Sequence, residues 1–176
     1  MKGQQYFEPA VGGHRNAVDL VHQINDLGRG KYLHDEKACD ENNKFCIGVA
    51  GYPEKHIEAP SMNYDLKWLK EKVDAGADYV VTQMFFDNKK FIDFVKQARD
   101  MGINVPIIPG IKPIATKAHL QMLPKVFKID LPEELISDVE KAKDNTTVKQ
   151  IGIEWAIQQC RELIDFGVPV LHFYSM

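Results

Sequence analysis

Side chains capable of binding chemistry follow the first apolar segment of this sequence. Gly-Val-Ala-Gly at 48–51 is followed by Tyr52, Glu54 and His56. Loops after the strands of a parallel sheet are where such proteins bind ligands, so Tyr52 and His56 are candidates for ligand contacts. Taken alone, a Tyr-Pro-x-x-His sequence is more often a tyrosine packed on its loop beside a solvated histidine.

Three polar side chains just beyond this loop share one face of a predicted helix. Asp65, Trp68 and Lys72 are spaced i, i+3 and i+7, which places them on the same side. A carboxylate can accept hydrogen bonds from hydroxyls, an indole can pack on a ring, and an ammonium can bind phosphate. A stripe of this kind is by itself usually a solvated face, but its position beside His56 favours a binding role.

Later strand ends supply further candidates. Gln83 interrupts an otherwise apolar segment, and a buried amide must be hydrogen-bonded, so it either satisfies the scaffold or binds a ligand ring. Both interpretations remain open from the residues alone. Residues 109–113, Pro-Gly-Ile-Lys-Pro, have a tight and preset backbone that suggests a wall of the site rather than a catalyst. His172 is by itself more typical of a core histidine than of a ligand contact.

Several site types lack support in this sequence. The acidic, histidine and cysteine side chains between 34 and 46 do not have the paired spacing of a structural zinc site, so no metal is expected. The sequence has no GxGxxG, Walker or GxSxG motif, which removes the best evidence for Rossmann dehydrogenases, nucleotide kinases and α/β-hydrolases. Gly-Gly-His-Arg at 12–15 could offer N–H groups and a cation to an anion, although two-glycine turns are common.

Composition indicates an ordinary globular domain. The chain has 176 residues, is 44% hydrophobic and 27% charged, and has a formal net charge of -3, which argues against a nucleic-acid surface. No apolar run is long enough to span a bilayer, and residues 1–5 lack the apolar core of a signal peptide. Three cysteines without CxxC spacing fit a reducing compartment, so we expect a cytoplasmic protein.

Hydrophobic periodicity predicts alternating strands and helices. Short apolar segments predict strands at 45–50, 77–86, 105–111 and 168–174, and helical spacing occurs at 17–27, 62–74, 89–101, 116–127, 132–143 and 147–166. This alternation predicts βαβ units and a parallel sheet with outer helices, in either a barrel or an open sheet. Residues 31–44 are the best candidate for a mobile insertion.

From residue 14 onward the sequence resembles the flavin-dependent methylenetetrahydrofolate reductases. The most specific matches are Val-Ala-Gly-Tyr-Pro-Glu-x-His-x-Glu-Ala at 49–59, the run 65–77, Thr-Gln-x-Phe-Phe-Asp at 82–87, Pro-Ile-x-Pro-Gly-Ile at 106–111 and His-Phe-Tyr at 172–174. The resemblance implies a (β/α)8 barrel that holds FAD at the carboxyl ends of its strands. It implies reduction of 5,10-methylenetetrahydrofolate to 5-methyltetrahydrofolate by NADH or NADPH, with hydride transfer through the flavin.

Site residues follow from the resemblance by position. The residues implied to line the FAD are Ala17, Tyr52, His56, Ala59, Asp65, Trp68 and Lys72. Gln83 would bind the folate pterin, and Tyr174 would lie on the folate side of the pocket. The family positions for a second folate-binding amide and an aromatic stacking residue fall at His119 and Leu123, where this sequence departs from the family's residue types.

The predicted elements account for only half of such a barrel. A (β/α)8 barrel needs eight strands and about 250 residues, whereas four strands are predicted here. We therefore expect residues 1–176 to form one partial barrel domain corresponding to family strands five to eight, without the glutamate that acts as general acid. Such a fragment would be inactive alone. It would be a truncated gene product, a separately encoded half that pairs with an N-terminal half, or a half-barrel that pairs with itself.

Two other classes of protein compete with this interpretation. A non-catalytic flavin- or nucleotide-binding module would keep Tyr52, His56, Asp65 and Lys72 and would need no acid. An unrelated barrel aldolase would need a Schiff-base lysine on a strand, and none of the four predicted strands carries one in its core.

Overall fold

Four parallel strands form the centre of the protein. The structure, a computed structural model, describes residues 8–31 and 44–175, so residues 32–43 of the predicted insertion lie outside the described part. The strands are β1 (Gly48–Gly51), β2 (Tyr79–Met84), β3 (Ile107–Ile111) and β4 (His172–Phe173). They are hydrogen-bonded in the order β1-β2-β3-β4, and each neighbouring pair is parallel.

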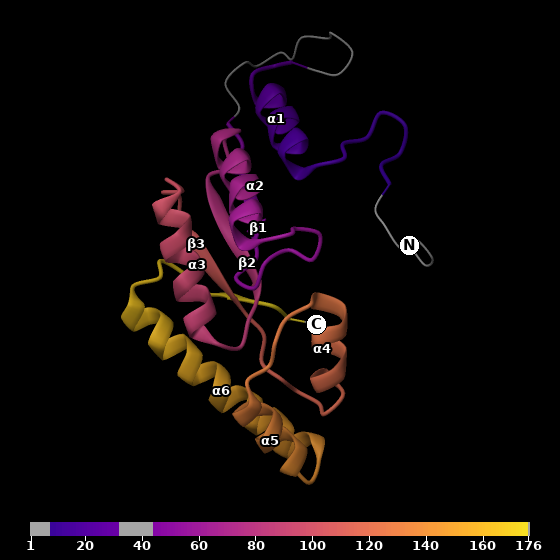
Figure 1. Cartoon of the computed structure of the whole chain (residues 1–176), viewed down its shortest axis with the longest axis vertical. Coiled ribbons are helices and arrows are strands. Elements are labelled where there is room, and N and C mark those ends of the chain that lie inside the picture. The colour runs from indigo at the N-terminus through magenta and orange to yellow at the C-terminus, as the bar shows by residue number, and fades with distance from the viewer. Residues whose placement is uncertain (1–7, 32–43, 176) are drawn as a thin grey trace.

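Helices connect each strand to the next (Figure 1). Their bounds are α1 (Ala17–Gly28), α2 (Met62–Asp74), α3 (Asn88–Asp100), α4 (His119–Phe127), α5 (Glu133–Lys141) and α6 (Asn145–Phe166). α1 precedes β1 and packs beside α2, while α4, α5 and α6 all lie between β3 and β4 along the chain. The parallel α/β architecture predicted from the periodicity is therefore confirmed.

Local sequence signals explain where the helices begin and end. The side chains of Ser61, Asp87 and Asp144 cap α2, α3 and α6 by accepting hydrogen bonds from backbone N–H groups of the first turn. α6 ends at Gly167, whose φ of 93° is the left-handed conformation that glycine adopts most easily.

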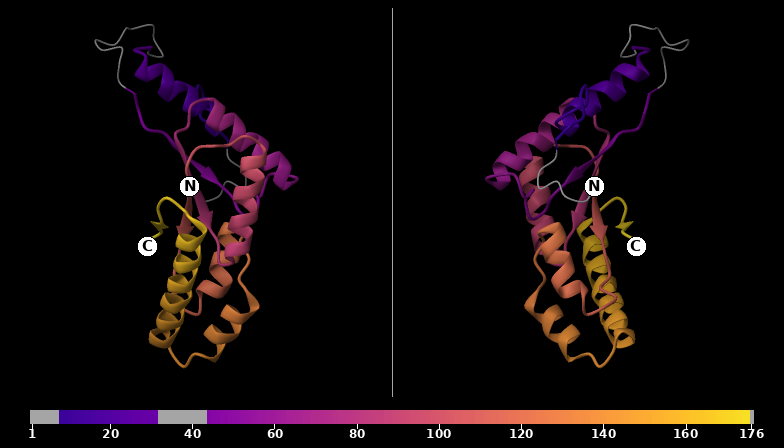
Figure 2. Two further views of the ribbon diagram at one scale, coloured as in Figure 1. Left: turned by 90° about the vertical axis from the view of Figure 1, so that its left-hand side faces the viewer. Right: turned by 90° about the vertical axis from the view of Figure 1, so that its right-hand side faces the viewer.

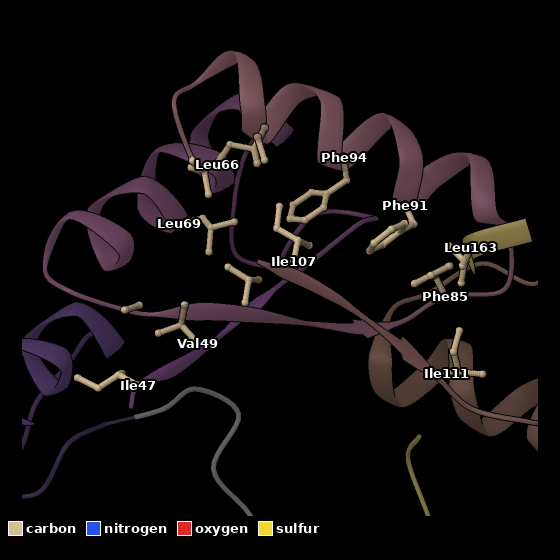
Figure 3. Close-up of a cluster of buried hydrophobic side chains, with 14 of the residues drawn as sticks. Ile47, Val49, Leu66, Leu69, Phe85, Phe91, Phe94, Ile107, Ile111 and Leu163 are labelled. Carbon is tan, nitrogen blue, oxygen red and sulfur yellow. The ribbon is translucent and has the colours of Figure 1, made fainter. Parts of the chain in front are cut away.

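A hydrophobic core joins the sheet to α2, α3 and α6 (Figure 3). Val49, Val80 and Ile107 project from three adjacent strands, and Phe91 and Phe94 project from α3, all with at most 9% of their surface exposed. A second cluster forms under α4, α5 and α6, and its buried members include Met84, Phe86, Ile114, Leu123, Leu135 and Val139. Burial of these side chains holds the helices against one face of the sheet.

The other face of the sheet is less covered by the described residues. Along β2 the burial alternates, so that Val80, Thr82 and Met84 are buried while Val81 and Gln83 are half-buried. Figure 2 shows the helices that connect the strands gathered on one side of the sheet. The residues of this second face are therefore available to a ligand or to further polypeptide.

The strands are shorter than the apolar segments that predicted them. β4 contains only residues 172 and 173 of the predicted strand 168–174, because it pairs with β3 at two positions, Gly110 with His172 and Ile111 with Phe173. An apolar segment marks where a strand can lie, but the neighbouring strand decides how many residues are paired.

Candidate functional site

A pocket of about 450 Å³ lies beside the carboxyl end of β1. It is lined by the start of α1, the loop after β1 and one face of α2. The lining residues are Arg15, Asn16, Ala17, Val18, Tyr52, His56, Glu58, Ala59, Tyr64, Asp65, Trp68 and Lys72. All seven residues that the resemblance assigned to FAD are among them, although they come from three separate segments of the chain.

Hydrogen bonds fix the loop that forms one wall of this pocket. The backbone N–H of His56 donates to Asp65 Oδ2 at 2.8 Å, which ties the loop to α2. The imidazole Nδ1 of His56 accepts from the N–H of Glu58 at 3.2 Å. Its ring meets that of Tyr52 edge-on, with centroids 4.7 Å apart. These contacts position the Tyr52 and His56 rings against one side of the pocket.

Lys72 supplies a partly buried cation to the same pocket. Its Nζ donates to the carbonyl oxygen of Ala50 at 2.7 Å, which leaves two further N–H donors. Burial lowers the pKa of Lys72 from its ordinary value, and the negative charge of Asp65 partly opposes that shift. Burial also raises the pKa of Tyr52, with further upward contributions from Asp65 and Tyr174.

Glu54 anchors the loop from its other side. Its side chain is 9% exposed, and Oε2 accepts from Lys90 Nζ at 2.8 Å and from the N–H of Asp130 at 2.9 Å. Lys90 also contacts Asp130 at 2.6 Å, so α3 and the segment before α5 are both linked to the loop. Burial raises the pKa of Glu54. Since Tyr52 and His56 flank Glu54, this ion-pair network positions the aromatic wall.

A second group of polar side chains gathers at the ends of β2, β3 and β4. The hydroxyl of Tyr174 donates to the carbonyl of Thr82 at 2.9 Å, and the N–H of Gly110 donates to Thr82 Oγ1 at 3.0 Å. Gln83 lies next along β2 and accepts from the N–H of Met84 at 3.0 Å, while no described residue accepts from its amide nitrogen. Its amide oxygen thus satisfies the scaffold, while its two N–H donors have no partner among the described residues.

The remaining predicted substrate residues lie in different environments. His119 begins α4, and its Nδ1 accepts from the N–H of Ala115 at 3.2 Å. Leu123 has no exposed surface and packs in the second core cluster, so it supports the site from behind rather than lining it. His172 is exposed, contrary to the expectation of a core histidine, and its ring lies edge-on to Tyr174 at 4.8 Å.

Several site residues were not found from the sequence. Arg15 was considered only as part of a common glycine turn, yet it lines the pocket. Glu58 and Tyr64 were not singled out, although Tyr64 lies one turn before Trp68, with the two rings 6.5 Å apart. The i, i+4 spacing of Tyr64 and Trp68 was the available signal.

The donor set of the pocket fits a flavin dinucleotide. Arg15 and Lys72 can bind phosphate oxygens, Asp65 can accept from ribose hydroxyls, and Trp68 offers an aromatic surface that is 39% exposed. Among residues 8–31 and 44–175, no group of three or more His, Cys, Asp and Glu side chains could hold a metal ion. In the same part of the chain, every helix is too short or too polar to cross a bilayer.

Fold and site together define a parallel α/β protein with a polar ligand pocket beyond its strand ends. The family model for methylenetetrahydrofolate reductase matches residues 1–176. The chain therefore belongs to the methylenetetrahydrofolate reductase family, which confirms the resemblance drawn from its motifs.

Relatives from three eukaryotes are similar to nearly the whole chain. It is 40% identical over 161 residues to a probable methylenetetrahydrofolate reductase (NADPH) of Caenorhabditis elegans, covering 90% of this chain and 24% of the relative. It is 40% identical over 184 residues to methylenetetrahydrofolate reductase (NADH) 1 of Arabidopsis thaliana, and the match covers 99% of this chain and 29% of that relative. Methylenetetrahydrofolate reductase 2 of Saccharomyces cerevisiae is 40% identical over 172 residues, and the match covers 96% of this chain and 26% of that relative. The chain thus spans about a quarter of the length of these curated relatives.

A solved structure supports the fold. An uncharacterized protein from Clostridium thermocellum, described as binding two copies of 5-methyl-5,6,7,8-tetrahydrofolic acid, superimposes with a TM-score of 0.56 and 20% sequence identity. The match covers 74% of this chain and 48% of that protein.

Proposed function

We propose that this chain holds the FAD and part of the folate site of a methylenetetrahydrofolate reductase. The observation that carries this proposal is the pocket in which all seven residues assigned to FAD by resemblance lie together. Family membership and the names of the relatives support reduction of 5,10-methylenetetrahydrofolate to 5-methyltetrahydrofolate by NADH or NADPH.

In this proposal the residues of the pocket bind and orient the dinucleotide. Lys72 and Arg15 neutralise phosphate charge, Asp65 accepts from hydroxyls, and Trp68 packs on an aromatic ring. Tyr52 and His56 form the wall toward the strand ends, where the free amide donors of Gln83 face the pterin. FAD held by these residues would supply the hydride carrier between the nicotinamide and the folate.

We further infer that the chain forms the C-terminal half of a (β/α)8 barrel. The four parallel strands with helices on one side, and the less covered second face, support this arrangement. The general acid is then supplied by an N-terminal polypeptide segment, because a second copy of the chain lacks the same glutamate and could complete only the barrel walls. Pairing with such a half would cover the open face of the sheet and complete the walls of the pocket.

FAD binding by the purified chain tests this proposal. We expect equilibrium dialysis to detect binding, and Lys72→Met to weaken it by about tenfold or more, because a charge-assisted phosphate contact is worth about 1.5–3 kcal/mol. Lys67→Met is the matched control, since Lys67 is exposed on the same helix and does not line the pocket. Absence of binding, or equal affinity in the two variants, would contradict the proposed flavin site.

The catalytic part of the proposal has a separate test. Adding a purified N-terminal half from one of the relatives should restore NADH- or NADPH-dependent formation of 5-methyltetrahydrofolate, measured by chromatography of the folates. Flavin binding without any restored turnover would instead favour the non-catalytic flavin module.

A further inference from the structure

Lys112 is a buried cation without an acidic partner among the residues that the structure describes. Only 7% of its surface is exposed, and its Nζ donates to the main-chain carbonyl of Tyr174 at a long 3.3 Å. No carboxylate of the part of the chain that the structure describes forms an ion pair with it. A buried ammonium is costly unless it is paired, so two of its three donors await an electronegative partner.

Lys112 lies where three strand ends converge. It directly follows β3, and Tyr174, which it contacts, follows β4 and donates its hydroxyl to Thr82 of β2. Strand ends of a parallel sheet are where α/β proteins bind their ligands. The ammonium is therefore buried at the carboxyl ends of the strands and not on an outer surface.

His119 adds a second donor at this corner. Its Nδ1 already accepts from the N–H of Ala115, so the neutral ring carries its proton on Nε2. Burial lowers the pKa of His119, and the positive charge of Lys112 lowers it further. His119 begins α4, which follows the segment that Lys112 starts, so both side chains belong to the connection after β3.

We propose that Lys112 binds an electronegative oxygen of the folate substrate, with His119 of the same connection as a second donor. This inference rests on the proposed function, because it names a substrate contact of the same site. The oxygen belongs either to the pterin carbonyl or to the glutamate carboxylates, both of which offer lone pairs to an ammonium. Residues 109–113 therefore form more than the inert wall that their sequence suggested.

Lys112→Met tests this contact, since methionine has a similar length and no charge. We expect isothermal titration of the purified chain with 5-methyltetrahydrofolate to show affinity reduced by about tenfold or more, as for loss of a charge-assisted bond. Lys112→Arg should retain most of the affinity. Lys125→Met is the matched control, because Lys125 is exposed on α4 and forms no ion pair among the described residues.

Thermal unfolding of the ligand-free variants separates binding from scaffolding. Removal of an unpaired buried charge should leave the unfolding midpoint of Lys112→Met unchanged or raised. A lowered midpoint together with unchanged folate affinity would mean that Lys112 serves the scaffold, which would overturn the proposal.

Two ligands identify the oxygen and keep this inference separable from the flavin proposal. A reduced pterin without the aminobenzoyl-glutamate tail should lose affinity in Lys112→Met if the pterin carbonyl is the partner, and should be unaffected if the carboxylates are. FAD binding is measured in parallel. Flavin binding with equal folate affinity in Lys112→Met and the unaltered chain, or with no folate binding at all, refutes the Lys112 contact and leaves the flavin site intact.

Discussion

At the scale of single residues, Lys72 and Asp65 control the charge of the proposed flavin pocket. Burial lowers the pKa of Lys72 below 10.5, and Asp65 raises it again. An anionic ligand favours the charged ammonium, so its affinity should fall as pH rises through the lowered pKa of Lys72. Removing the charge of Asp65 should lower that pKa further and move the loss of affinity to lower pH.

Equilibrium dialysis with FAD across the alkaline range measures this effect. We expect the alkaline loss of affinity to shift downward in Asp65→Asn and to disappear in Lys72→Met. In Lys72→Arg it should move to higher pH, because the guanidinium stays protonated. An unchanged alkaline profile in Lys72→Met would show that another group is responsible.

The two parts of the site differ in how far their residues could be predicted. Asp65, Trp68 and Lys72 were predictable as one face because helical spacing is a local property. The burial of Lys112 was not, because it depends on Tyr174, which is 62 positions away along the chain. The residues around Lys112 in the sequence do not predict its contact with Tyr174.

At the scale of elements, Gly152 sets how closely α6 approaches the segment after β3. A Cβ atom at this position would lie 1.9 Å from the backbone oxygen of Ile114, and backbone cannot move aside as a side chain would. Alanine normally stabilises a helix relative to glycine, but here the clash with Ile114 should make the alanine variant less stable than the unaltered protein. We expect Gly152→Ala to lower the free energy of unfolding by about 1–3 kcal/mol.

Denaturant unfolding followed by circular dichroism checks this value. Lys149→Ala is the control, because Lys149 is exposed on the same helix and its replacement should leave stability within about 0.5 kcal/mol. A neutral or stabilising effect of Gly152→Ala would mean that α6 and the segment after β3 can separate without cost.

Helices were predicted more closely than strands for a physical reason. The expected range 62–74 coincides with α2, since Ser61 caps its start within the local sequence. The predicted strand 168–174 shrank to His172–Phe173, since pairing with β3 decides its length. The alternation of strands with helices predicted that the strands are parallel. It could not predict whether they close into a barrel, because four strands alternate with helices in the same way in an open sheet.

At the scale of the whole molecule, α6 carries an apolar face that the sheet does not use. Ala156 and Leu163 point into the core, whereas Ile157 and Ile164 are 45% and 59% exposed. Ile157 and Ile164 line an apolar groove of about 350 Å³ together with Phe173 of β4. Exposed apolar surface next to a short edge strand favours association of one chain with another.

We therefore expect the purified chain to self-associate through this groove as concentration rises. Ile157→Glu places a charge in the groove without touching the buried face of α6, so it should shift the mass measured by light scattering after gel filtration toward the monomer. Val126→Glu is the matched control, because Val126 is 59% exposed on α4 and lies outside the groove. Two variants that associate equally would show that the groove is not the contact, and a monomeric mass for the unaltered chain at every concentration would contradict self-association.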